Sequence, residues 1–198
     1  LSDSENRQKF KELYNNIQTK HHLDKISPEM LSSIKEIIFN IEKKRLYRGK
    51  GGQIIRSAVC RFIECLAKSE IVLNTREIVK LQETLNDCIM HTAAEIQDAS
   101  AAAIIEFSQV YHNSPGKALV DKTLLVSIKK LTDFCKSKEV PANISRGSAL
   151  ALGCFSYSLI TVNPQKIVTT LVNTTKIKGT ESDDAETRKN AARSLGQL

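Results

Sequence analysis

Apolar residues recur at spacings of three and four positions along most of the chain, which is the pattern of amphipathic α-helices. Successive stripes are displaced from one another by 43 to 47 residues. We therefore expect an all-α protein with a helix around each stripe. The four stripes are Leu31, Ile34, Ile38 and Ile41; Ile78, Leu81, Leu85 and Cys88; Leu124, Ile128 and Leu131; and Ile167 and Leu171.

A second set of helices is expected between these stripes, and each contains a patch of small residues. The patches lie at 56–60, 97–102, 145–153 and 188–196, again about 44 residues apart. A two-helix repeat of this length is typical of HEAT arrays, in which stacked helix pairs share one core. Armadillo repeats add a third short helix, for which the connections leave no room. The predicted fold class is an all-α, HEAT-like α-solenoid of about four helix pairs, an armadillo-like superhelix.

Helix-start signals place the repeats at about 28–69, 74–112, 117–160 and 163–198. Ser27 precedes Pro28, as a capping residue precedes a proline in the first helical turn. Asn74 with Glu77 forms a capping-box pattern, and Asn163 precedes another proline.

Residues 1–26 carry Phe10, Leu13, Tyr14 and Ile17 at helical spacing. We interpret them as an N-terminal helix, the second helix of a preceding repeat. The alternative is a frayed end, since the segment holds many polar residues. The lack of an initiating Met leads us to expect a fragment of a longer protein.

The chain has 29 Lys and Arg against 22 Asp and Glu, a net charge of +7, and one segment holds the whole excess. We call its basic residues the basic corner. They lie between Glu42 and Glu64 with no acid among them. The members are Lys43, Lys44, Arg45, Arg48, Lys50, Arg56 and Arg61.

Two interpretations of the basic corner are open. Residues 43–45 can compensate the dipole at the C-terminus of a helix, and Arg61 can pair with Glu64 on its own helix. These local roles suit any one residue. For the cluster as a whole, a docking site for an acidic surface is favoured.

No catalytic, metal or cofactor constellation emerges from the residue pattern. Cysteines occur at 60, 65, 88, 135 and 154, an odd number without a Cys-x-x-Cys pair, which indicates buried, reduced thiols in a cytosolic protein. Cys88 and His91 supply too few ligands for a metal. The glycines of 48–52 lack the spacing of a phosphate loop and predict a tight turn between helices. We expect a non-enzymatic chain without a cofactor.

Two further classes of partner are disfavoured. No aromatic residues alternate with the basic corner, so a stacking platform for nucleic acid is missing. The longest uncharged stretch, 147–165, contains serines, Asn163 and Pro164, which argues against a membrane span. Arg56, Arg146 and Arg188 recur near the same repeat position, and we expect them to hydrogen-bond along the stack.

One segment carries a specific family resemblance. Residues 47–64 read Tyr-Arg-Gly-Lys-Gly-Gly-Gln-Ile-Ile-Arg-Ser-Ala-Val-Cys-Arg-Phe-Ile-Glu and resemble the tubulin-specific chaperone D (tubulin-folding cofactor D) family, in its C-terminal HEAT-repeat region. Residues 146–153 and 185–189 are similar to the same family but are more generic. The match extends over about 30–198. The chain departs from the family in having no Trp after the first motif.

The resemblance implies a non-catalytic scaffold in the cytoplasm, associated with the cytoskeleton. Such a chaperone binds β-tubulin and assists assembly and disassembly of the αβ-tubulin heterodimer. It supports GTP hydrolysis on tubulin together with cofactors C and E, and an Arf-like small GTPase is a regulatory partner. The alternative hypothesis is a HEAT-repeat adaptor of another class, in transport or nucleic-acid scaffolding.

Overall fold

The computed structural model describes residues 27–44, 52–112, 118–137, 139–155, 163–176 and 184–198. Within these ranges the regular secondary structure consists of helices, with no strand, which confirms the predicted all-α class. The expected N-terminal helix in 1–26 lies outside the described residues. The helices are α2 (Pro28–Lys44), α3 (Gly52–Lys68), α4 (Thr75–Ile89), α5 (Ala94–Tyr111), α6 (Ala118–Lys136), α7 (Ala142–Leu152), α9 (Pro164–Thr175) and α10 (Ala185–Leu195).

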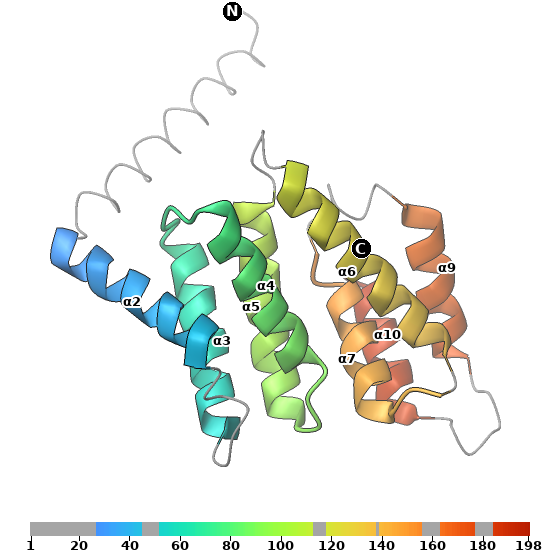
Figure 1. Ribbon diagram of the computed structural model, residues 1–198. Helices are drawn as coiled ribbons and strands as arrows, with labels where there is room; N and C mark the ends of the chain where they lie inside the picture. The colour runs from blue at the N-terminus through green and yellow to red at the C-terminus, as the bar shows by residue number, and fades with distance from the viewer. Residues whose placement is uncertain (1–26, 45–51, 113–117, 138, 156–162, 177–183) are drawn as a thin grey trace, which may run out of the picture.

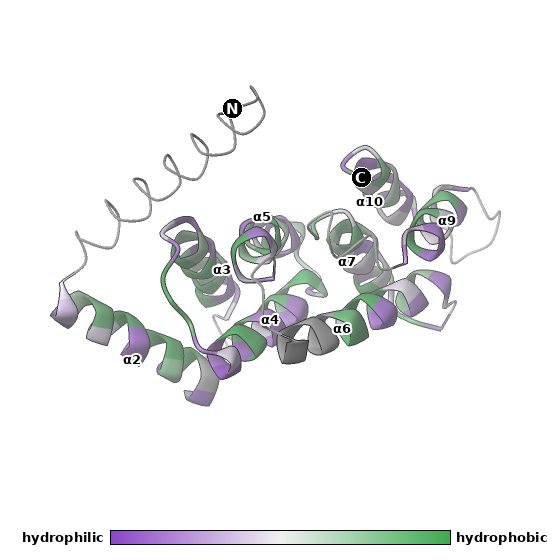
Figure 2. Ribbon diagram, turned by 90° about the horizontal axis from the view of Figure 1, so that it is seen from above, coloured by the Kyte–Doolittle hydropathy of each residue, from purple (hydrophilic) through white to green (hydrophobic). Residues whose placement is uncertain are grey.

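The helices are arranged in two layers (Figure 1). Seen from above, α3, α5, α7 and α10 form one layer, and α2, α4 and α6 form the other (Figure 2). Contacts join neighbours within a layer, such as α3 with α5, and partners across the layers, such as α6 with α7. At the C-terminal end, α9 packs on both α6 and α10. This arrangement is solenoid-like, because each helix contacts mainly the helices of its own and the adjoining repeats.

The predicted apolar stripes form the core between the layers. All four residues of the α4 stripe are buried, and so are Ile128 and Leu131 of α6 and Ile167 and Leu171 of α9. The α2 stripe differs, because only Ile38 is fully buried while Leu31 is exposed. Ile34 and Ile41 are partly buried against the core. Within the described part of the chain, helix α2 is therefore covered on a narrower face than its sequence pattern predicts.

Buried hydroxyl groups tie the helices together at their backbones. The Ser100 hydroxyl of α5 donates to the Leu85 carbonyl oxygen at 2.8 Å, and Ser194 of α10 donates to Ala149 at 2.7 Å. The Tyr111 hydroxyl contacts the carbonyl oxygens of Leu66 and Ile71 at 3.2 and 2.7 Å. Satisfied polar groups of this kind avoid the cost of burying an unpaired donor.

Helix starts follow the sequence signals with one exception. The Ser27 hydroxyl accepts from the Met30 amide at 3.2 Å, and Asn74 with Glu77 forms the complete capping box. Helix α9 begins at Pro164 as expected, but the Asn163 side chain makes no capping hydrogen bond. No helix in the described ranges is long and apolar enough to cross a bilayer.

The expectation that every cysteine is buried is wrong for one residue. Cys60, Cys88, Cys135 and Cys154 are buried, whereas Cys65 is exposed. Cys65 lies one turn after Arg61, on the outer face of α3, while Ile63 and Leu66 of the same helix are buried. The apolar character of a cysteine side chain was therefore not enough to predict whether Cys65 is buried.

Candidate partner-binding surface

The basic corner begins on α2, and a polar anchor fixes this helix to α4. The Lys35 ammonium bonds the Glu77 carboxylate at 2.7 Å and the Val72 carbonyl oxygen at 3.1 Å. The same Glu77 oxygen accepts the Asn74 amide of the capping box at 2.8 Å. Glu77 therefore serves two roles, since it starts α4 and holds α2 against it.

Lys43 is the first member of the corner, and it is exposed near the end of α2. Its ammonium lies 5.1 Å from the centre of the Phe39 ring, one helical turn earlier, and Phe39 is 53% exposed. A cation over an aromatic face is attracted by the ring's electron density. The end of α2 thus presents a cation and an apolar ring together.

The two arginines of α3 have different roles. Arg56 is half-buried, and its guanidinium Nη1 lies 3.9 Å from the Cys88 sulfur of α4. Arg61 is exposed. The Glu64 carboxylate bonds Lys68 at 2.5 Å, so the pairing of Arg61 with Glu64 considered above is not formed. Among the described residues, no carboxylate forms an ion pair with Arg61.

The remaining members of the corner are only partly covered by the structure. Arg45, Arg48 and Lys50 lie outside the described residues, as does the side chain of Lys44. The structure therefore places Lys43 and Arg61 at the surface and assigns Arg56 to the contact between α3 and α4.

Exposed apolar side chains lie on the same helix pair, a feature that the sequence reasoning missed. Ile54, in the first turn of α3, is 81% exposed, and Ile55 beside it is also exposed. Met30 and Ile37 are exposed two turns apart on α2. Apolar surface with interspersed arginine is common where proteins bind each other. The sequence offered no distinguishing signal, because adjacent apolar residues of the same helix can also both be buried.

The recurring arginines differ in what they contact. Arg146 of α7 forms a two-pronged pair with Asp184, with distances of 2.8 Å from Nε and 2.6 Å from Nη2. This contact raises the pKa of Arg146 and holds the pKa of the Asp184 carboxyl well below its usual value. It joins α7 to the start of α10, as expected for a residue that bonds along the stack.

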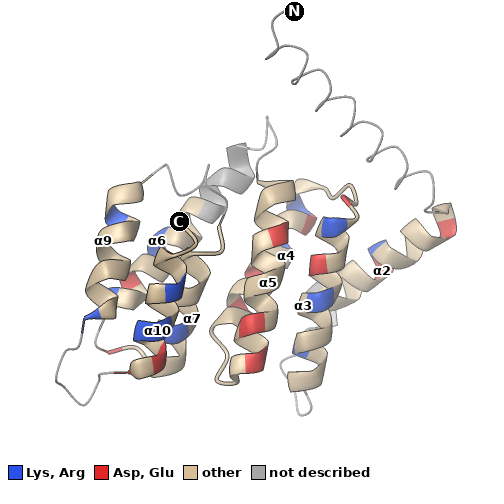
Figure 3. Cartoon of the chain, turned by 180° about the vertical axis from the view of Figure 1, so that it is seen from behind, with Lys and Arg blue, Asp and Glu red and all other residues tan. Residues whose placement is uncertain are grey.

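In the layer formed by α3, α5, α7 and α10, the sign of the charge differs from helix to helix (Figure 3). Helix α5 carries Glu95, Asp98 and Glu106 without any Lys or Arg, whereas α3 and α10 are rich in basic residues. Weak bridges cross this pattern, from Lys68 to Glu106 at 4.0 Å and from Arg193 to Asp98 at 3.3 Å. The cations of α3 are therefore bounded by acid on the α5 side.

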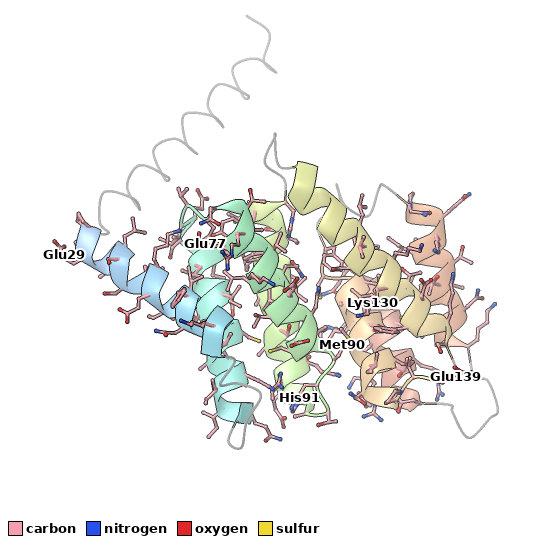
Figure 4. The ribbon with its side chains drawn as sticks, viewed as in Figure 1. Glu29, Glu77, Met90, His91, Lys130 and Glu139 are labelled. Atoms are coloured by element: carbon pink, nitrogen blue, oxygen red, sulfur yellow. The ribbon has the colours of Figure 1, made fainter. Side chains whose placement is uncertain are left out.

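Cys88 and His91 do not form a metal site with other described residues, among which no group of three His, Cys, Asp or Glu side chains comes together. Met90 and His91 lie where α4 ends (Figure 4). The His91 Nδ1 accepts the Ala93 amide at 3.1 Å, and burial and nearby Arg56 lower the pKa of the His91 ring.

No family model matches the chain, and no solved structure gives a significant match to it.

Proposed function

We propose that this chain is a non-catalytic binding scaffold of a tubulin-folding cofactor, which docks β-tubulin and the αβ-tubulin heterodimer through its basic corner. In this role it assists assembly and disassembly of the heterodimer and supports GTP hydrolysis on tubulin together with cofactors C and E.

The observation that carries the proposal is that α2 and α3 each carry an exposed cation and an exposed large apolar side chain. The cations of Lys43 and Arg61 are exposed, and exposed Phe39 and Ile54 lie on the same two helices. A surface that combines cations with large apolar groups suits an acidic protein, because nucleic-acid readers rely on phosphate contacts and stacked bases.

The choice of tubulin among acidic proteins rests on sequence resemblance. The motif in 47–64 overlaps the basic corner and resembles the cofactor D family. Tubulin is strongly acidic, so a basic surface favours both its capture and the rate of encounter. A scaffold also agrees with the absence of a phosphate loop in 48–52, since the GTP in question is bound by tubulin.

The test is binding of the purified chain to αβ-tubulin, with charge reversals inside and outside the corner. The variant Lys43→Glu with Arg61→Glu should weaken binding about tenfold or more, because two attractive contacts become repulsive. A matched variant, Lys129→Glu with Lys189→Glu, changes the net charge equally on α6 and α10 and should bind as the unmodified chain does. Added salt should weaken binding of the unmodified chain.

Two outcomes would contradict the proposal. One is tubulin binding that is insensitive to salt and equal in both variants, which would remove the basic corner from the mechanism. The other is tight RNA or DNA binding at physiological salt without tubulin binding, measured by mobility shift on the same preparation. That result would favour the nucleic-acid adaptor.

A further inference from the structure

Helix α3 has a second apolar face, which no described helix buries. Its core face is buried and includes Val59, Ile63 and Leu66. Beside it, four apolar residues follow one another at spacings of three, four and three positions, the pattern that predicts a packed helix face. Three of them are exposed and the phenylalanine is half-buried. We call them the α3 stripe: Ile55, Ala58, Phe62 and Cys65.

Uncovered apolar surface is concentrated on the first helix pair, which lies at one end of the array (Figure 1). Within the described ranges, α4, α5, α7 and α10 expose no large apolar side chain. On α2, by contrast, Met30 and Ile37 are exposed and share a face with the partly buried Ile34 and Ile41. Both helices of the pair therefore present an apolar edge on which another helix can pack.

The N-terminal segment of the chain has the sequence and the position that such a helix requires. It directly precedes α2, and in the described chain a helix of the α3 layer comes before each later pair, as α3 comes before α4 and α5 before α6 (Figure 2). The same order assigns the segment before α2 to the layer of α3, next to the α3 stripe. Its apolar residues share one face of a helix, with spacings of three, one and three positions. They are Phe10, Leu13, Tyr14 and Ile17.

We propose that residues 10–17 pack as a helix on the α3 stripe and close the N-terminal end of the solenoid. Because the segment is tethered to α2, its effective concentration at the stripe is on the order of millimolar. A second copy docked stripe to stripe would instead bring together the exposed Arg61 of both chains, whose like charges repel. The proposal is independent of tubulin binding, although a partner that uses Ile54 must displace the segment first.

The first test uses a thiol on the stripe as the reporter. All five cysteines lie in the described ranges, and among them Cys65 alone is exposed. Leu13→Asp with Ile17→Asp should speed alkylation of Cys65 by iodoacetamide several-fold, because carboxylates do not pack on an apolar face. The matched control is Gln8→Asp with Asn15→Asp, which adds the same charge on the opposite face of the predicted helix and should keep the original rate.

Two results of this labelling would overturn the proposal. One is an equal rate in the unmodified chain and in both variants, which would mean that the segment does not cover the stripe. The other is a rate in the unmodified chain that rises on dilution, which would assign the cover to a second copy.

The second test locates the segment by fluorescence. The chain has no Trp, so Tyr14→Trp introduces a single reporter. Its emission should be blue-shifted and weakly quenched by acrylamide. Adding Ile54→Asp with Ala58→Asp should shift the emission to the red, whereas Val126→Asp on α6, at a residue 67% exposed, should not. Circular dichroism verifies that each variant is folded. A solvent-exposed indole in Tyr14→Trp, or a buried one that the α3 substitutions leave unchanged, would overturn the proposal.

Discussion

At the residue scale, the small residues of α7 determine how closely its neighbours approach. A Cβ atom on Gly147 would lie 1.8 Å from the Ile89 carbonyl oxygen at the end of α4. A Cβ on Gly153 would lie 2.6 Å from Ser194 of α10. The sequence identified this patch as one that permits close packing, but it could not say which neighbour each glycine contacts. That information depends on the crossing of helices that are distant in sequence.

Gly147→Ala should therefore destabilise the fold by about 2 kcal/mol or more, since backbone atoms of α4 must move to admit the methyl group. Gly196→Ala is the matched control, because its Cβ would lie 3.4 Å from the nearest atom and its φ of −75° suits alanine. We expect the control to change stability by no more than about 0.5 kcal/mol in urea unfolding. Equal stability of the two variants would refute the close contact.

At the scale of elements, one carboxylate both starts a helix and joins it to another. Asp184 accepts the Thr187 amide at 2.8 Å as the cap of α10, and it pairs with Arg146 of α7. The sequence predicted the caps at Ser27 and Asn74 because their patterns are local. It predicted that Arg146 bonds along the stack but did not identify Asp184 as the partner, since 37 residues, among them α9, separate the two in the sequence.

Substitutions of Asp184 separate its two roles. Asp184→Asn keeps a good capping residue but weakens the ion pair, and should cost about 1 kcal/mol after allowance for solvent screening of Arg146. Asp184→Ala loses both roles and should cost about 2 kcal/mol. Chemical unfolding measures both. An alanine variant no less stable than the asparagine variant would show that the cap contributes nothing.

The stability of the folded chain should depend on pH through the Asp184 carboxylate. The Arg146 contact lowers the pKa of Asp184 in the folded chain, so its contribution is complete above the unfolded-state pKa of about 3.9 and is lost as the pH falls below it. In Asp184→Asn this part of the acid sensitivity should be absent. Unfolding curves collected from neutral pH to pH 3 would reveal it. If the free energy of unfolding fell equally with pH in the unmodified chain and in Asp184→Asn, this role of Asp184 would be contradicted.

At the scale of the whole molecule, the helical periodicity predicted the fold class. An apolar stripe such as that of α4 lies on one face of its helix, and that face must pack against other helices to be buried. The periodicity failed where burial depends on what lies beside a helix. Leu31 of α2 and Cys65 of α3 are exposed despite their apolar patterns. The charge excess in 43–61 identified a candidate surface, but the exposed isoleucines of α3 appeared only once the helices were placed.

The separate positions of cations on the molecule allow a direct test of where a partner docks. Lys43 lies at the end of α2, while Lys129 and Lys130 are exposed on α6. Lysine crosslinking of the chain bound to αβ-tubulin, followed by mass spectrometry, reports which of these surfaces the partner touches. The account predicts crosslinks to tubulin from Lys43, Lys44 and Lys50, and few from α6. Crosslinks confined to Lys129 and Lys130, or none to tubulin, would contradict it.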